Sequence, residues 1–204
     1  MVMLRGQAAD RVRQAIMEAE HHTDAEFVAV LTREADAYRF VPTLWAALLA
    51  LPTPPLLTQI SLGLTPFDLL LFQVLVFTLL ALLFRVPALK YSLIPKAIKA
   101  RRADDLAVRQ FLDQGVHRTT QGFGVLFFVA KAEHHVRLIA DHGIDRHVDQ
   151  IEWQQIVDNF TAAVKRGEVE TGFLNVVEAV GVILRRVAPV THTRDELPNH
   201  LVLL

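Results

Sequence analysis

The stretch FVPTLWAALLALPTPPLLTQISLGLTPFDLLLFQVLVFTLLALLF, residues 40–84, is almost free of charge and decides how the chain is organised. Asp68 is its only charged residue. One bilayer crossing needs about 20 predominantly apolar residues, so the stretch is long enough for two. The alternative is a buried hairpin of a soluble protein, but the rest of the chain is too short to cover so large an apolar core. We therefore predict a transmembrane helical hairpin, which occupies residues 37–94 with its flanks.

The two expected crossings differ in how regular they are. The first, Phe40–Leu62, contains three prolines within residues 52–55, and each proline removes a backbone donor. We predict that it is a kinked helix, followed by a turn at Gly63–Pro66 and a second crossing at Pro66–Phe84. A second interpretation places the turn at the prolines and leaves only a short arm before them.

Basic residues flank the expected hairpin on one side of the membrane only. They are Arg33 and Arg39 before it, and Arg85, Lys90, Lys96, Lys99, Arg101 and Arg102 after it. The turn between the crossings carries none. The positive-inside rule then predicts that both termini are cytoplasmic. Aromatic and basic side chains near the ends of the crossings are expected at the membrane interface, namely Tyr38, Trp45, Arg85, Lys90, Tyr91 and Lys96.

The sequence on either side of the hairpin has the periodicities of a soluble α/β layer. The patterns predict helices near residues 8–21, 96–114, 151–165 and 172–186, and strands near residues 27–31, 123–129 and 135–140. The last two strands are expected to form an antiparallel hairpin around residues 131–133. The membrane hairpin therefore interrupts an α/β domain that closes from both sides of it.

Several classes of function are excluded by composition. The chain has no cysteine, and its two serines, Ser61 and Ser92, lie in or beside the apolar stretch. A cysteine nucleophile and a soluble serine triad are therefore unavailable. No phosphate-binding glycine loop or zinc-protease helix motif is present. The net charge of −1 gives no reason to expect nucleic acid as a partner.

Three consecutive segments carry a resemblance to a known family. Thr119–Val129 reads TTQGFGVLFFV, Ala132–Asp141 reads AEHHVRLIAD, and Gly143–Ile144 follows. This pattern of strand, turn and strand ending near glycine resembles the TPM domain, and in particular an uncharacterised bacterial membrane branch of that family. The resemblance implies a small sheet sandwiched by helices and a location in the bacterial inner membrane.

On this resemblance, the chain divides into four parts. Residues 1–36 and 95–189 form the first part and the remainder of the TPM-like domain, residues 37–94 form the hairpin, and residues 190–204 form a tail. Some members of the family are proposed to be phosphatases, some bind calcium through aspartates near strand ends, and others are accessory or assembly factors. This chain departs from the metal-binding members by having Thr119, Thr120 and Gln121 where those members tend to carry an acid.

The polar segment Asp141–Asp149, DHGIDRHVD, is the one concentration of candidate site residues. Asp141, His142 and Asp145 are the best candidates for metal ligands, with His147 and Asp149 as further members. A mixed set of carboxylates and imidazoles suits zinc or manganese better than calcium. The alternative is a solvated connection from a strand to a helix, with Asp149 near the helix start. No residue is nominated as catalytic.

Three functions remain open from the sequence. The first is a non-catalytic accessory or assembly factor, with the lipid bilayer and another membrane protein as partners. The second is a membrane-tethered phosphatase that depends on a divalent metal, the one cofactor that the sequence suggests. The third is a small-solute transporter built from oligomerised hairpins, which would depend on Asp68.

Overall fold

The structure, a computed structural model, describes residues 4, 6–60, 63–119, 121–191 and 201–204. The chain divides into two compact units. One is formed by residues 1–35 together with residues 100–204, and the other by residues 36–99. The first unit is a mixed α/β fold and the second is a helical hairpin, and each is described separately below.

The α/β unit contains the expected helices and strands in the expected order, together with two short elements that were not expected, α7 (His142–Asp145) and β4 (Leu201–Leu203). In chain order, its helices and strands are α1 (Gln7–Glu20), β1 (Glu26–Thr32), α6 (Lys96–Asp113, which begins in the other unit), β2 (Gly124–Ala130), β3 (His135–Ala140), α7, α8 (Gln150–Lys165), α9 (Val169–Val187) and β4. A short 3-10 turn, Val116–Arg118, precedes β2. The strand β4 was not expected from the sequence, because three residues are too few to show a period. The rest of the tail, residues 192–200, lies outside the described residues.

The four strands form one mixed sheet in the order β3-β2-β1-β4. The central strand β1 is parallel to β2, with Val28 opposite Leu126, and parallel to β4. The expected hairpin of β2 and β3 is antiparallel, with Val129 opposite Val136. Every residue of β1 and β2 is buried, as expected of strands that are covered on both faces.

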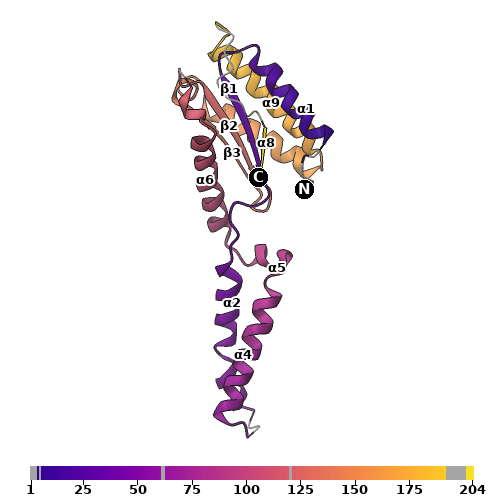
Figure 1. Cartoon of the computed structure of the whole chain (residues 1–204), viewed down its shortest axis with the longest axis vertical. Coiled ribbons are helices and arrows are strands. Elements are labelled where there is room, and N and C mark those ends of the chain that lie inside the picture. The colour runs from indigo at the N-terminus through magenta and orange to yellow at the C-terminus, as the bar shows by residue number, and fades with distance from the viewer. Residues whose placement is uncertain (1–3, 5, 61–62, 120, 192–200) are drawn as a thin grey trace. The chain divides into compact units, whose positions relative to one another are not determined.

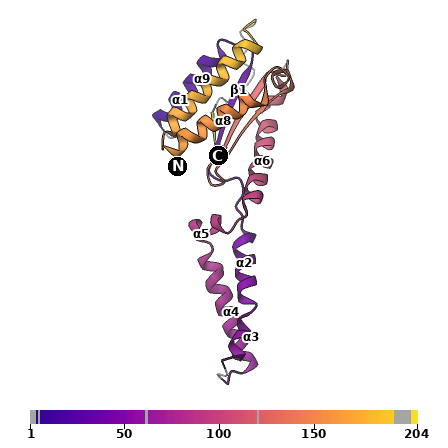
Figure 2. The same ribbon diagram turned by 180° about the vertical axis from the view of Figure 1, so that it is seen from behind.

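Helices cover both faces of this sheet, as the resemblance implied (Figures 1 and 2). Alternate residues of β1 and β2, such as Phe27 and Phe127, belong to the core formed with α1, α8 and α9. The residues between them, such as Val28 and Phe128, pack with Ala103 of α6 on the opposite face. Since strand side chains alternate between faces, one pair of strands supplies both cores.

Three phenylalanines form the centre of the larger core. Phe127 of β2, Phe160 of α8 and Phe173 of α9 are at most 2% exposed. Their ring centroids lie 5.0 Å apart for Phe127–Phe160, 5.7 Å for Phe127–Phe173 and 5.0 Å for Phe160–Phe173, all with edge-to-face geometry. This is the favoured arrangement for aromatic rings, and it ties both helices to the middle of the sheet.

The second unit is a helical hairpin. It consists of α2 (Phe40–Ala50), α3 (Thr53–Thr58), α4 (Pro66–Leu83) and α5 (Pro87–Ser92). Both α2 and α3 contact α4, so the turn follows α3 and does not lie at the prolines. The prolines at 52, 54 and 55 instead break the first leg into two short helices, because none of them can donate a backbone hydrogen bond. Ser61 and Leu62, where the first crossing was expected to end, lie outside the described residues.

The second leg begins with a capping box. The backbone N–H of Asp68 donates to Thr65 Oγ1 at 3.3 Å, and the backbone N–H of Thr65 donates to Asp68 Oδ2 at 2.9 Å. Thr65 Oγ1 also donates to the same carboxylate oxygen at 2.7 Å. Thr65 and Asp68 therefore each satisfy one backbone donor at the start of α4, which favours a structural role for Asp68 over an ion pathway.

Both legs of the hairpin expose apolar side chains. In the part of the chain that the structure describes, two helical segments are long and apolar enough to cross a membrane, Phe40–Thr58 with mean hydropathy 1.5 and Pro66–Leu83 with mean hydropathy 2.2. No residue of α4 is buried. Nine of its large apolar side chains are at least 43% exposed, namely Phe67, Leu70, Leu71, Phe72, Val74, Leu75, Leu79, Leu82 and Leu83. The other four, Leu69, Val76, Phe77 and Leu80, are partly exposed.

Candidate functional site

The predicted polar segment begins where β3 ends. Asp141 caps the short helix α7, and its Oδ1 accepts a hydrogen bond from the backbone N–H of His142 at 2.7 Å. The same oxygen lies 2.9 Å from Nδ1 of the His142 ring. The backbone N–H of Asp141 donates to the carbonyl oxygen of Gly124 at 2.8 Å. Asp141 thus joins the start of β2 to the loop after β3, and its carboxylate serves the local backbone.

Close backbone contact holds this loop against the segment before β2. The N–H of Gly143 donates to the carbonyl oxygen of Gly122 at 3.0 Å. A Cβ atom at Gly143 would lie 2.6 Å from the carbonyl oxygens of both Gln121 and Gly122. Gly122 itself has a φ of +69°, a conformation that favours glycine. Gly122 and Gly143 are therefore explained by the packing of two loops.

Replacing Gly143 by alanine should destabilise the α/β unit by about 1–3 kcal/mol, because the added methyl group meets two backbone oxygens that cannot rotate away. Chemical denaturation monitored by circular dichroism would measure the change. The control is His142→Ala, since the side chain of His142 is 77% exposed. Equal stability of Gly143→Ala and wild type would contradict the packing argument.

The other polar residues of the segment have separate local roles. His147 Nδ1 lies 2.9 Å from the carbonyl oxygen of Gly143. Asp149 caps α8 and accepts a hydrogen bond from the N–H of Ile151 at 3.1 Å, as the solvated-connection alternative expected. Among the described residues, no three histidine, aspartate or glutamate side chains are grouped so that they could hold a metal ion. Asp141 and His142 form a pair, and a metal site that includes Asp145 stays a prediction.

Asp145 belongs instead to the lining of a pocket beside β3. The pocket has a volume of about 370 Å³. It is lined by Val136, Arg137, Leu138, Ile139, Ala140, Asp145, Gln150, Trp153, Gln154 and Val157. One wall is thus formed by β3 from Val136 to Ala140, and the other by the first half of α8. This pocket could not be predicted from the sequence, because its two walls come together only when α8 packs on the sheet.

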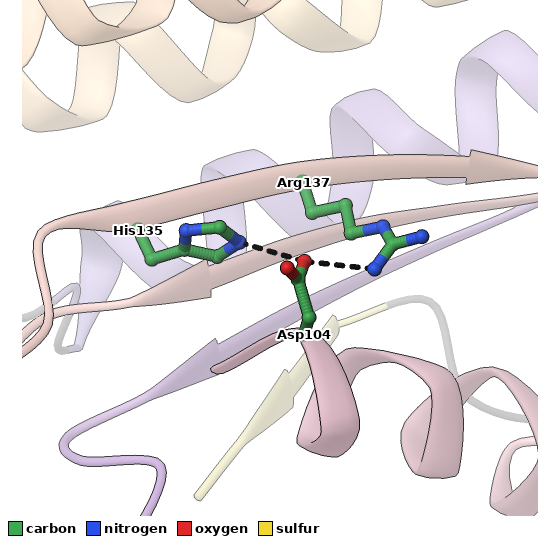
Figure 3. A network of polar contacts seen from close by, with 3 residues as sticks. All are labelled: Asp104, His135 and Arg137. Carbon is green, nitrogen blue, oxygen red and sulfur yellow. Dashed lines mark hydrogen bonds and ion pairs between the residues drawn. The ribbon is translucent and has the colours of Figure 1, made fainter. Parts of the chain in front are cut away.

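A polar network lies on the other face of β3, the face that packs against α6. The sequence did not predict it. The Asp104 carboxylate of α6 lies between two β3 side chains (Figure 3). Its Oδ1 is 3.0 Å from His135 Nε2 and 2.7 Å from Arg137 Nη1. Since Asp104 is far from both partners in sequence, no local pattern could identify the network. The three side chains are 22–40% exposed, so we assign the network to positioning α6 rather than to a large gain in stability.

Several of the expected interface residues come together at one end of the hairpin. The Tyr38 and Tyr91 rings pack edge to face with centroids 6.4 Å apart. Lys90 Nζ lies 5.8 Å and 4.9 Å from the two centroids, within range of a cation–π interaction. Trp45 Nε1 donates to the carbonyl oxygen of Leu93 at 3.2 Å. Arg85 and Lys96 are exposed, and a position of these residues at a membrane interface stays a prediction.

The fold defines the class of the protein. It is a mixed α/β domain whose four-stranded sheet has helices on both faces. Residues 92–183 match the sequence profile of the TPM domain. This match confirms the TPM domain that the strand–turn–strand motif suggested.

A solved structure shares the fold. It is the NMR structure of the BA42 protein from the psychrophilic bacterium Bizionia argentinensis. The TM-score is 0.62 with 17% sequence identity, and the alignment covers 100% of this chain and 97% of the other. At this identity the likeness concerns the fold alone. No curated protein sequence matches the chain.

Proposed function

We propose that this chain is an integral protein of the bacterial inner membrane, and that its cytoplasmic TPM domain acts as a non-catalytic accessory or assembly factor for another membrane protein. The observation that carries the membrane part is the exposed apolar surface of α4, on which no residue is buried. Burial of apolar surface is worth about 25 cal/mol per Å². A helix that is apolar all round is therefore stable in lipid and unfavourable in water.

The accessory role is supported by how the strand-end segment uses its polar groups. Asp141 and Asp149 both cap helices, and His147 bonds to a backbone carbonyl. Such groups are already engaged by their own chain, whereas a metal-dependent phosphatase needs carboxylates directed at a shared ion. The alternative, a membrane-tethered phosphatase that uses a divalent metal, is favoured by one observation, the close pair of Asp141 and His142 at the end of a strand.

Phosphatase turnover separates the two functions. We expect purified wild type and Asp141→Asn to show the same background rate on an aryl phosphate, with or without added zinc, manganese or calcium. Asparagine is a fair replacement because it retains the oxygen that caps α7. Turnover that requires both a metal and Asp141 would establish the phosphatase and reject the accessory role.

The orientation of the protein can be tested with fusions after Leu204. The basic residues that flank the hairpin predict a cytoplasmic C-terminus. A reporter that is active only in the cytoplasm should therefore be active, and an alkaline phosphatase reporter that needs export should be silent. The reverse pattern would place the TPM domain outside the cytoplasm and overturn the charge argument.

A further inference from the structure

The strand β3 is an edge of the sheet, with β2 as its neighbour in the described part of the chain. The hydrogen bond from Asp141 N to Gly124 O shows that these two opposed residues are a hydrogen-bonded pair. In an antiparallel ladder, such pairs alternate with pairs that do not exchange hydrogen bonds. His135, Arg137 and Ile139 therefore direct their backbone groups toward β2.

The backbone groups of the residues between them point in the opposite direction. Val136, Leu138 and Ala140 direct their N–H and C=O groups away from β2, toward the open edge of the sheet. All six residues of β3 are partly exposed, in contrast to the fully buried β1 and β2. The edge thus presents three donors and three acceptors at the spacing of a β-strand, which only another extended backbone matches in full.

The pocket described above adjoins this edge. Its lining combines Val136–Ala140 with the side of α8 that carries Gln150, Trp153 and Gln154. A segment added to β3 would place alternate side chains on the same face of the sheet as α8. The space beside β3 is therefore open at the position where such side chains would enter.

The charges around the pocket favour a basic side chain. Arg137 is engaged by Asp104 through an ion pair of 2.7 Å. Asp145 is exposed and lies just beyond the end of β3, where it lines the same pocket. Because the side chain of Arg137 lies on the opposite face of the sheet with Asp104, the charged side chain that the pocket itself offers is the carboxylate of Asp145.

We propose that the groove between β3 and α8 binds an extended peptide segment of a partner protein, which adds to the sheet as a fifth strand and places a lysine or arginine beside Asp145. Main-chain hydrogen bonds to an exposed edge are a general mode of peptide recognition. This inference rests on the accessory role proposed above, because it names the kind of partner that such a role requires. Peptide binding and phosphatase turnover are separate measurements, so each can fail without the other.

The test uses the full chain in detergent micelles and labelled synthetic peptides. Each peptide alternates valine and threonine over about seven residues, the length that spans β3. It carries a single charged residue, lysine or glutamate, placed at the N-terminal end in one version and at the C-terminal end in another. A further peptide has alternate amides N-methylated, so it cannot pair with an edge. Fluorescence anisotropy should show binding of a lysine peptide, weaker binding of its glutamate counterpart and no binding of the methylated one. Hydrogen exchange should slow at the amides of Val136, Leu138 and Ala140.

Two substitutions test the site itself. Leu138→Pro removes an outward-facing donor without removing a hydrogen bond to β2, and proline is accepted on edge strands in this position. We expect it to weaken binding about tenfold, because one hydrogen bond is lost and the ring obstructs the edge. Asp145→Lys should reverse the preference to the glutamate peptide, by about threefold in each direction. Asp113→Lys, on the exposed end of α6, is the matched control and should change nothing.

Three results would overturn the proposal. The first is absence of binding for every peptide in the set. The second is binding that is indifferent to both Asp145→Lys and Leu138→Pro, with circular dichroism showing that both variants are folded. The third is protection of the β3 amides without peptide that grows with protein concentration, since it would show that the edge pairs with a second copy of this chain.

Discussion

Replacing Leu75 by arginine is expected to expel α4 from the membrane. Leu75 lies near the middle of α4 and is 51% exposed, so in the proposed arrangement its side chain contacts lipid. Exchanging leucine for arginine at the centre of a membrane helix costs about 3 kcal/mol on insertion scales, which shifts the insertion equilibrium about a hundredfold. Resistance of the full chain to alkaline extraction from isolated membranes would measure the loss.

The matched control is Leu112→Arg. Leu112 lies near the end of α6 in the α/β unit and is 49% exposed, so the same change at the same exposure should leave extraction unaltered. If Leu75→Arg remained as firmly in the membrane as wild type, α4 would not cross the bilayer. If Leu112→Arg were extracted as readily as Leu75→Arg, the loss would reflect added charge in general.

The second large effect concerns the aromatic centre of the core. Phe127→Ala should lower the free energy of unfolding of the α/β unit by about 3–5 kcal/mol. The side chain is fully buried and packs edge to face on both Phe160 and Phe173, so its removal leaves a cavity that these two helices cannot both close. Domains of this size are stable by about 5–15 kcal/mol, so the loss would be a large part of the total.

Denaturant unfolding followed by near-ultraviolet circular dichroism would measure this change. Phe67→Ala is the control, because Phe67 lies on α4 and is 70% exposed. It should leave the unfolding of the α/β unit unchanged. A loss below about 1 kcal/mol for Phe127→Ala would show that the core does not depend on this ring cluster.

Much of the fold could be predicted because its elements are long and their burial is periodic. The fully buried strand β2 reads as a continuous apolar run, and α9 buries a single face that recurs at helical spacing. The cap at Asp149, which was expected near a helix start, follows from local chemistry. The cap at Asp141 was not predicted, because the four-residue helix α7 is too short to show a period. The strand β4 could not be predicted, because its three residues acquire their conformation by pairing with β1.

The candidate sites also divide into features that local sequence predicts and features that long-range packing creates. The glycines and acids around Asp141 were visible in sequence, although their role in loop packing was not. The contact of Asp104 with His135 and Arg137 and the pocket beside Asp145 were not visible, because each joins elements that are far apart in the chain. Local patterns report on neighbours within one helix or strand, whereas these sites depend on which helix packs against which strand.

The sequence by itself determined that an apolar hairpin interrupts an α/β domain of the TPM family, because hydrophobic periodicity and length suffice to mark helices, strands and an uncharged stretch. The tertiary structure alone decided that β3 is an edge strand, that its open side adjoins α8, and that Asp145 lies there without the other proposed ligands. The physical reason is that strand order and helix placement follow from long-range packing of the two cores, and no short segment of the chain encodes them.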